Sequence, residues 1–224
     1  SDREQVAGVL AQIDAEMPPL RGVIHAAMVL NDCLLANLDR STVHRVWAPK
    51  IAGALHLHHG TLGHDLDFFV LFSSMGSVYG FGGQANYASA NTFLDSLGYY
   101  RQSQGLPGVS ISWGYLGEVG WVAEHQEIAT RFESMGVHGF SPRHALSLLG
   151  RFVQTQPPHV GVLQGDWSKL AEVTGSISPR VAHLARARAS AGDGDKNAAA
   201  IRAALLAADP AAPPEMLGAI LCDQ

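Results

Sequence analysis

The sequence predicts an α/β fold in which helices cover both faces of a parallel sheet. Three short, largely apolar runs, at residues 20–27, 67–74 and 108–113, have the length and composition of buried strands. Stretches of helical character at 41–59 and 84–104 lie between them, and this alternation is typical of parallel sheets. The 224 residues, 47% hydrophobic and 16% charged, suffice for one globular domain or slightly more.

Further elements are expected on either side of this alternating region. Ser1 and Glu4 have the spacing of a capping box, and apolar residues follow at helical spacing until a pair of prolines ends the pattern. A serine followed by a proline predicts the start of a helix over 141–154. A fourth strand is expected at 160–164, beside that helix.

The composition changes after residue 175, which we take as the end of the first domain. Ala, Arg, Asp, Gly and Pro dominate residues 176–212, which we interpret as a linker carrying an Ala-rich helix. Residues 213–224 resemble the first turns of another helix, so we expect a further domain to follow.

Charge and cysteine content exclude several classes of protein. A net charge of −5 gives no basic surface for nucleic acid, and two cysteines far apart, Cys33 and Cys222, favour a reducing compartment, so we expect a cytoplasmic protein. No run of eighteen apolar residues and no signal-peptide pattern occurs, so no membrane span is expected. The histidines at 56, 58, 59 and 64 lack the spacing of a closed zinc site, and we expect no bound metal.

Three polar side chains are expected to meet at one edge of the sheet. The run 67–74 ends on Ser74, and a Gly-rich loop leads from it to a helix that carries Tyr87 and Asn91. Ligands of parallel α/β sheets bind beyond the carboxyl ends of the strands. Residues four apart share one face of a helix, so Tyr87 and Asn91 can reach the same crevice as Ser74.

The segment FSSMGSVYGFGGQANYASANTFLD, in which Tyr87 follows Ser74 by thirteen residues, resembles the catalytic segment of ketoreductase domains from modular polyketide synthases. Matching motifs over about three quarters of the chain are LRGVIHAAMVLND from Leu20, WAPK at 47–50, SWG at 112–114 and GVLQGDW at 161–167. The resemblance implies a Rossmann-like, doubly wound sheet of the short-chain dehydrogenase type. Residues 1–175 would be its catalytic portion without the first βαβ unit, which holds the cofactor pyrophosphate, so this chain alone is not expected to bind NADPH normally.

The resemblance also implies the roles of four residues. Most short-chain dehydrogenases have a lysine four residues after the tyrosine, where this chain has Asn91; polyketide ketoreductases have it upstream, where Lys50 precedes Ser74 by twenty-four residues. Hydride addition to a ketone leaves negative charge on oxygen, which a proton donor and hydrogen bonds stabilise. Tyr87 would be the acid, Lys50 the cation that adjusts its pKa, Ser74 the hydrogen-bond donor to the carbonyl, and Asn91 the residue that positions a water.

A nicotinamide cofactor, by resemblance NADPH, must supply the hydride, because no side chain can. The residues that the resemblance places against it are His25, Ala26, Ala27, Met28, Trp113 and Gly114. The family usually has glycine where this chain has Met28. The side chain would either crowd the nicotinamide pocket or turn into the core as a filler.

The same resemblance suggests residues that control stereochemistry. Asp32 matches the key acid of the Leu-Asp-Asp motif of B-type ketoreductases, which form the D-configured alcohol. Tyr79 stands where the opposite class has tryptophan, and Asn86, just before the tyrosine, also suits the B-type pattern. Residues 115–140 resemble the mobile lid over the substrate.

The expected activity is the NADPH-dependent reduction of a β-ketoacyl thioester, carried on the phosphopantetheine of an acyl carrier protein, in polyketide or lipid biosynthesis. The expected partners are that carrier protein and the other domains of a multifunctional transferase. Two alternatives remain open. One is a non-catalytic module that scaffolds or docks neighbouring domains, and the other is the ketoreductase of a fatty-acid synthase.

Overall fold

The computed structural model describes residues 2–174 and 184. Apart from Leu184, the predicted linker at 176–212, its Ala-rich helix and the terminal helix at 213–224 lie outside the described residues. The chain forms two compact units, Ser1–Gln164 and Gly165–Gln224. The second contains helix α8 (Trp167–Thr174).

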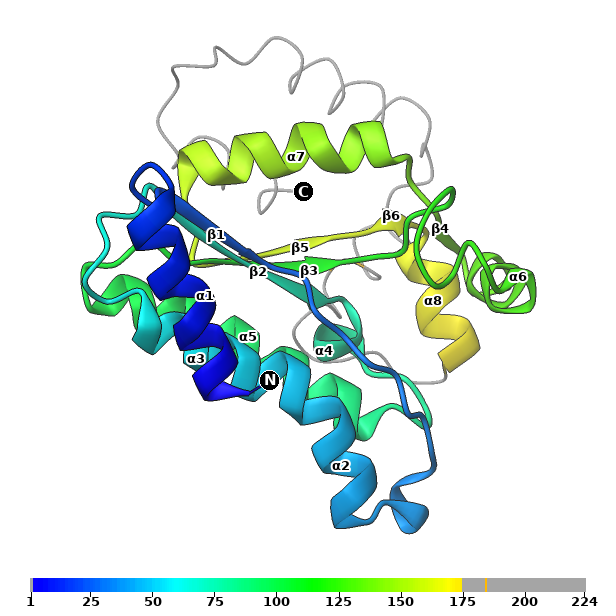
Figure 1. Ribbon diagram of the computed structural model, residues 1–224. Coiled ribbons are helices and arrows are strands. Elements are labelled where there is room, and N and C mark those ends of the chain that lie inside the picture. Colours follow the sequence, from blue (N-terminus) through cyan, green and yellow to red (C-terminus); the bar gives the residue numbers. More distant parts are fainter. Residues whose placement is uncertain (1, 175–183, 185–224) are drawn as a thin grey trace, which may run out of the picture. The chain divides into compact units, whose positions relative to one another are not determined.

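A four-stranded parallel sheet forms the centre of the first unit (Figure 1), as the alternating pattern predicts. Its order is β1 (Gly22–His25), β2 (Phe68–Ser74), β3 (Val109–Trp113) and β5 (His159–Val162). Every residue of β3 is buried, whereas β1 is an edge strand with an exposed Ile24. The fourth predicted strand is shorter than expected, because β5 ends at Val162 and β6 (Gln164–Gly165) is separate.

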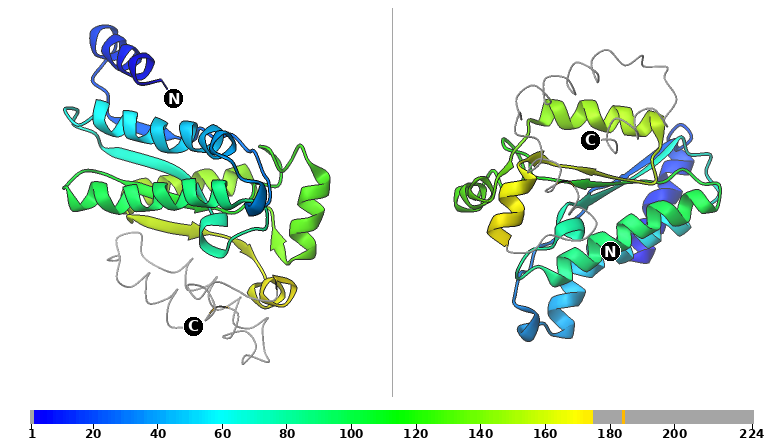
Figure 2. Two further views of the ribbon diagram at one scale, coloured as in Figure 1. Left: turned by 90° about the horizontal axis from the view of Figure 1, so that it is seen from below. Right: turned by 180° about the vertical axis from the view of Figure 1, so that it is seen from behind.

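Helices cover both faces of the sheet, which confirms the doubly wound arrangement (Figures 1 and 2). Helix α7 (Pro142–Thr155) packs its apolar side against Val70, Val109 and Ile111. Helices α3 (Gly53–Gly60) and α5 (Ala85–Ser103) pack on the opposite face, around Phe69 and Leu71. Burying each large apolar side chain contributes on the order of 1.5–3 kcal/mol, so β2, which supplies both cores, holds the layers together.

Helix α1 (Arg3–Glu16) starts later than the capping box predicts. Asp2 is its N-cap, and the Asp2 carboxylate accepts a hydrogen bond of 3.0 Å from the backbone N–H of Gln5. Ser1 lies outside the described residues. The prediction that Ser1 caps the helix is wrong because a carboxylate at the next position offers a charged acceptor at the positive end of the helix dipole.

The predicted helix over 41–59 is interrupted in its middle. Helix α2 (Arg40–Trp47) leads into a π-helical turn, η2 (Ala48–Ala52), which continues directly as α3. The turn contains Pro49, which has no N–H to donate and widens the regular hydrogen-bond pattern. The wide turn buries the side chain of Lys50, which a regular exposed helix would leave in solvent.

Short helices occupy regions that the sequence describes only as loops. The Gly-rich segment after β2 forms α4 (Gly76–Tyr79), and the predicted lid contains α6 (Gln126–Ser134) and β4 (Val137–His138). A single 3-10 turn, η1 (Leu35–Asn37), follows β1. Among the helices of the described residues, none combines the length and apolar character needed to cross a bilayer.

Candidate active site

Side chains of Ser74, Lys50 and Tyr87 line one cavity of about 530 Å³ beyond the carboxyl end of β2. Strand β2 ends on Ser74, and the first turn of α5 carries Tyr87. Asn91, one turn further along α5, is fully buried behind Tyr87. The structure therefore brings together the four residues that the sequence singles out, although they come from three separate elements.

Lys50 is 2% exposed, so its ammonium group lies in the protein interior. Its Nζ donates a hydrogen bond of 2.9 Å to the carbonyl oxygen of Phe72 and lies 5.2 Å from the ring centroid of Tyr87. Burial lowers the pKa of Lys50 to about 8, while the negative charge of Asp95 opposes this shift. Lys50 is therefore a cation that loses its proton just above neutral pH.

Burial also raises the pKa of Tyr87, and this effect exceeds the lowering that contacts with Asn91 and Ser74 produce. Asp32 adds a smaller upward shift. Nζ of Lys50 lies over the face of the ring and donates to the Phe72 carbonyl rather than to the phenol oxygen. That Lys50 adjusts the pKa of Tyr87 during reduction stays a prediction.

Two buried polar atoms near the cavity have no hydrogen-bond partner among the described residues: Asn91 Oδ1 and Trp113 Nε1. Asn91 Nδ2 donates to the Tyr87 carbonyl at 2.8 Å, which fixes the amide and leaves its oxygen free. Buried polar atoms are nearly always paired in native proteins. These two are therefore candidates for contact with a water or a bound ligand.

The six residues that the resemblance places against the cofactor do not all reach the cavity. Ala26, Met28, Trp113 and Gly114 line it, whereas Ala27 is exposed and does not. His25 is buried elsewhere: its Nε2 lies 3.1 Å from the Lys50 carbonyl oxygen, and burial lowers its pKa. His25 therefore supports the turn that carries Lys50.

Met28 points toward the site and not into the core. It is 42% exposed and lines the cavity, and the hydroxyl of Tyr87 donates to its sulfur at 3.9 Å. The alternative that Met28 fills the core is therefore wrong. Strand β1 ends at His25, so Met28 belongs to the segment beyond the strand end, at the level of the cavity.

The three residues assigned to stereocontrol differ in position. Asp32 and Tyr79 line the cavity; Asp32 accepts a hydrogen bond of 2.7 Å from Gln84, and burial raises the pKa of Tyr79. Asn86 is buried and does not line it. Its side chain donates to the Asn31 carbonyl and accepts from the Tyr87 N–H, each at 2.9 Å, so Asn86 fixes the start of α5.

The predicted lid contributes to the wall of the cavity. Phe132 on α6 lines it, stacks on Tyr115 with ring centroids 5.1 Å apart, and meets Phe81 edge-on at the same distance. Phe81 in turn meets Tyr79 edge-on at 4.9 Å. A chain of aromatic rings thus connects the lid to the segment after α4, and loop composition alone did not reveal it.

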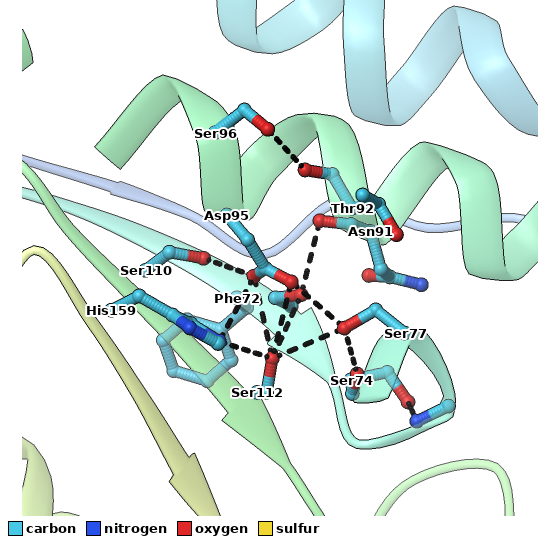
Figure 3. Close-up of polar contacts among 12 residues, drawn as sticks. Phe72, Ser74, Ser77, Asn91, Thr92, Asp95, Ser96, Ser110, Ser112 and His159 are labelled. Carbon is cyan, nitrogen blue, oxygen red and sulfur yellow. Dashed lines mark hydrogen bonds and ion pairs between the residues drawn. The ribbon is translucent and has the colours of Figure 1, made fainter. Parts of the chain in front are cut away.

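Sequence reasoning missed the polar residues that support the site from behind. Asp95, on α5, is buried among Ser77, Ser110, Ser112 and His159 (Figure 3). The available signal was the spacing: Tyr87, Asn91 and Asp95 recur every four residues, and two of the serines alternate along β3.

The histidines excluded as a zinc site have other surroundings in the structure. His58 is buried, with Nδ1 2.8 Å from a guanidinium nitrogen of Arg101, and His64 forms an ion-pair contact of 2.9 Å with Asp14. Within the part of the chain that the structure describes, no group of three or more histidine, cysteine or acidic residues could hold a metal ion.

Comparison with known proteins agrees with the fold and the motifs. The family model of the KR domain matches residues 1–118. The chain is 39% identical over 161 residues to the phenolphthiocerol synthesis polyketide synthase type I Pks15/1 of Mycobacterium marinum, a match that covers 70% of this chain and 8% of that synthase. It is 44% identical over 162 residues to the polyketide synthase GfsB of Streptomyces halstedii, covering 70% of this chain and 3% of that synthase.

A solved structure of A-type ketoreductases from a modular polyketide synthase superposes with a TM-score of 0.73 at 38% identity, covering 80% of this chain and 37% of that one. The chain therefore belongs to the KR domain family, as a ketoreductase domain of polyketide synthases within the short-chain dehydrogenase superfamily. It spans less than a tenth of the two synthases named above.

Proposed function

We propose that this chain forms the catalytic part of an NADPH-dependent reductase that converts a β-ketoacyl thioester, carried on an acyl carrier protein, to the β-hydroxyacyl thioester. One observation carries the proposal. Ser74, Lys50 and Tyr87 line a single cavity beyond the strand ends, and the unpaired amide oxygen of Asn91 lies behind them. A proton donor, a hydrogen-bond donor and a buried cation are what a developing alkoxide requires.

Each residue has a defined task in this reaction. The oxygen of Ser74 accepts the N–H of Gly76 at 3.2 Å, and the Ser74 hydroxyl donates its own proton to the substrate carbonyl. The hydroxyl of Tyr87 transfers its proton to the same carbonyl oxygen. The ammonium of Lys50, held by the Phe72 carbonyl, stabilises the phenolate that remains, and Asn91 positions the water that returns a proton.

The residues around the cavity fit the nicotinamide end of NADPH. Ala26, Met28, Trp113 and Gly114 form its wall, and Trp113 Nε1 is a buried donor without a partner among the described residues. NADPH, when bound, supplies the hydride to the carbonyl carbon. The largely apolar remainder of the cavity, with side chains such as Leu30 and Ile128, suits the acyl chain.

The partners follow from the relatives. The curated proteins that match are named as polyketide synthases, so other domains of such a synthase are the expected neighbours. We assign Asp32 and Tyr79 to product configuration, with the D-configured (B-type) alcohol as the expected product. Chiral analysis of the alcohol tests this assignment, and the opposite enantiomer would contradict it.

Replacing Tyr87 by phenylalanine tests the proposed acid. The variant removes one oxygen from a half-buried ring, so the fold should remain while reduction falls by at least about 100-fold. The measurement is NADPH oxidation with a β-ketoacyl thioester by the longer polypeptide that contains this chain. Tyr99→Phe is the matched control, because Tyr99 lies on the same helix and is exposed. A full rate in Tyr87→Phe would show that Tyr87 is not the acid.

The contact between Met28 and Tyr87 favours a second candidate, a non-catalytic module that scaffolds neighbouring domains. In this structure the Tyr87 hydroxyl donates its proton to the Met28 sulfur, and reduction would need the same proton for the substrate carbonyl. Calorimetry with NADPH on the polypeptide that contains this chain separates the two candidates. Binding supports the reductase, and its absence supports the scaffold.

A further inference from the structure

A buried carboxylate lies next to the proposed catalytic residues and has no part in the reaction described above. Asp95, on α5, is 7% exposed. It accepts hydrogen bonds of 2.8 Å from the hydroxyls of Ser77 and Ser110 and a longer one of 3.3 Å from Ser112 (Figure 3). His159 Nε2 is 3.5 Å from the carboxylate and 2.9 Å from the Ser112 oxygen. Hydroxyl donors from α4 and β3 thus converge on one side chain of α5, and the imidazole of His159 on β5 lies beside them.

This network reaches the proposed catalytic residues through two backbone carbonyls. The Ser77 hydroxyl is also 2.8 Å from the carbonyl oxygen of Ser74. The Ser73 hydroxyl lies 3.3 Å from the carbonyl of Asn91 and 3.3 Å from the Ser112 hydroxyl. Asp95 is one turn beyond Asn91 on the same helix face. The network therefore ties α5 to the end of β2 at the level of the cavity.

A carboxylate is a costly way to hold two elements together. Burying a charge is unfavourable unless it is paired, and apolar residues of similar volume often hold a helix on a sheet more strongly. Hydrogen bonding alone does not require the charge, because an amide could take its place. The negative charge therefore calls for a reason of its own.

The reason lies in Lys50. This ammonium is buried, and the ion pairs formed by the described residues do not include it; its nearest acceptor is the uncharged carbonyl of Phe72. The charge of Asp95 acts on Lys50 through the same low-dielectric interior and favours the cationic form. Lys50 donates to the carbonyl of Phe72 on β2, and the network of Asp95 includes the hydroxyl of Ser73 and the carbonyl of Ser74, the next two residues of that strand.

We propose that Asp95 is a positioning residue that fixes the catalytic face of α5 on the sheet and supplies the buried counter-charge that keeps Lys50 cationic. The inference rests on the proposed function, in which Lys50 acts as a cation. In this proposal the serine hydroxyls donate hydrogen bonds to Asp95 and so stabilise its charged form inside the protein.

The proposal predicts how a charge-removing substitution changes the response to pH. The titratable groups that face Lys50 are His25 from β1 and Tyr87 and Asp95 from α5, and His159 from β5 faces Asp95. The pKa of Lys50 is about 8, so the ammonium form is lost as the pH rises through 8. Removing the opposing negative charge must lower that pKa further, and the alkaline loss of activity must begin at lower pH.

The experiment compares Asp95→Asn with Asp95→Glu and Ser110→Ala. Asparagine keeps the shape and removes the charge, glutamate keeps the charge, and Ser110→Ala removes one hydrogen bond but leaves the carboxylate. Lys50 is titrated directly by the ε-carbon NMR signal of labelled lysine. The sequence has three lysines, Lys50, Lys169 and Lys196, and Lys50→Arg assigns the signal. The alkaline limb of kcat is recorded in parallel, with the same substitutions in the longer polypeptide that contains this chain.

We expect Asp95→Asn to lower the Lys50 midpoint by about one pH unit, and the glutamate and Ser110 variants to leave it near that of the unmodified chain. An unchanged midpoint in Asp95→Asn would overturn the proposal, since a purely structural residue would alter melting temperature alone. If Asp95→Asn does not fold, Asp95→Ser provides the same comparison. A shifted NMR midpoint without any ketoreduction by the longer polypeptide would support the counter-charge and refute the proposed function, so the two failures are distinguishable.

Discussion

The side chain of Met28 limits access to the phenol of Tyr87. Its sulfur accepts the phenol O–H at 3.9 Å, and its side chain occupies the wall of the cavity next to the place where a substrate carbonyl must arrive. Glycine, which the family usually has there, would leave that space open. A substrate therefore has to displace a contact that a glycine-containing relative would not make.

Replacing Met28 by glycine should increase kcat/KM by about fivefold, because a weak hydrogen bond of about 1 kcal/mol no longer competes with the substrate. Met28→Leu is the matched control, since leucine keeps the volume and removes the acceptor. If kcat/KM increases in both variants, the effect comes from the sulfur. If it increases in Met28→Gly alone, the effect comes from the volume of the side chain. Both variants are made in the longer polypeptide that contains this chain, and a rate in Met28→Gly at or below that of the unmodified polypeptide would contradict the prediction.

Those residues of the candidate site that belong to a recognisable motif were predictable from the sequence. The types and spacing of Ser74, Tyr87 and Lys50 match a known pattern, and the structure brings them to one cavity, while their roles stay predictions. The direction of Met28 was not predictable, since it depends on where the chain turns after β1. Asp95 escaped notice because its donors come from segments far apart in the sequence, and a single aspartate on a helix gives no local signal.

At the scale of elements, Arg101 attaches the end of α5 to α3 and β2. Its Nε donates to the Pro107 carbonyl at 2.7 Å, its guanidinium lies 3.8 Å from the ring centroid of Phe69, and Nη1 lies 2.8 Å from Nδ1 of His58. Arginine has no acceptor, so Nδ1 of His58 must accept and carry no proton. The pKa of His58 is lowered, mainly by burial and to a smaller extent by the charge of Arg101.

This contact should make stability depend on pH. Because the folded pKa of His58 lies below its unfolded value of about 6.5, the unfolded chain binds more protons there, so the free energy of unfolding falls as the pH falls through 6.5. Urea unfolding at pH 7.5 and 5.5 measures the loss. His58→Gln, which keeps an acceptor that does not titrate, should lose less stability over the same interval (roughly pH 7.5 to 5.5). Equal losses in both proteins would exclude His58 as the source.

The helices and strands were predictable from the sequence where one kind of residue runs through the whole element. Strands β2 and β3 are continuous runs of apolar and small residues, and the structure places them within one residue of the predicted ranges. The single turn of α4 is too short to show a helical period, and α6 is hidden because glycines and aromatic residues surround it. The π-helical turn at Lys50 was also missed, because proline signals a break without specifying its geometry.

At the scale of the whole molecule, the sheet has an edge that other residues could cover. Among the described residues β1 pairs with β2 alone, so its second row of backbone N–H and C=O groups has no strand beside it. Ile24 in this strand is 51% exposed. Exposed, apolar edge strands are rare in isolated domains because they promote aggregation. The chain also spans only 37% of the solved ketoreductase chain that it matches.

We therefore predict that the chain gains ketoreduction when it is part of a longer polypeptide that supplies the remainder of the ketoreductase. A strand added beside β1 would bury Ile24 and complete the floor of the cofactor site next to Ala26 and Met28. NADPH oxidation with a β-ketoacyl thioester, measured for this chain and for the longer polypeptide, should show turnover in the second alone. Hydrogen exchange at the amides of β1 should slow in the same comparison. Equal exchange in both would mean that the edge stays open, and turnover by the chain alone would mean that these residues already hold the cofactor.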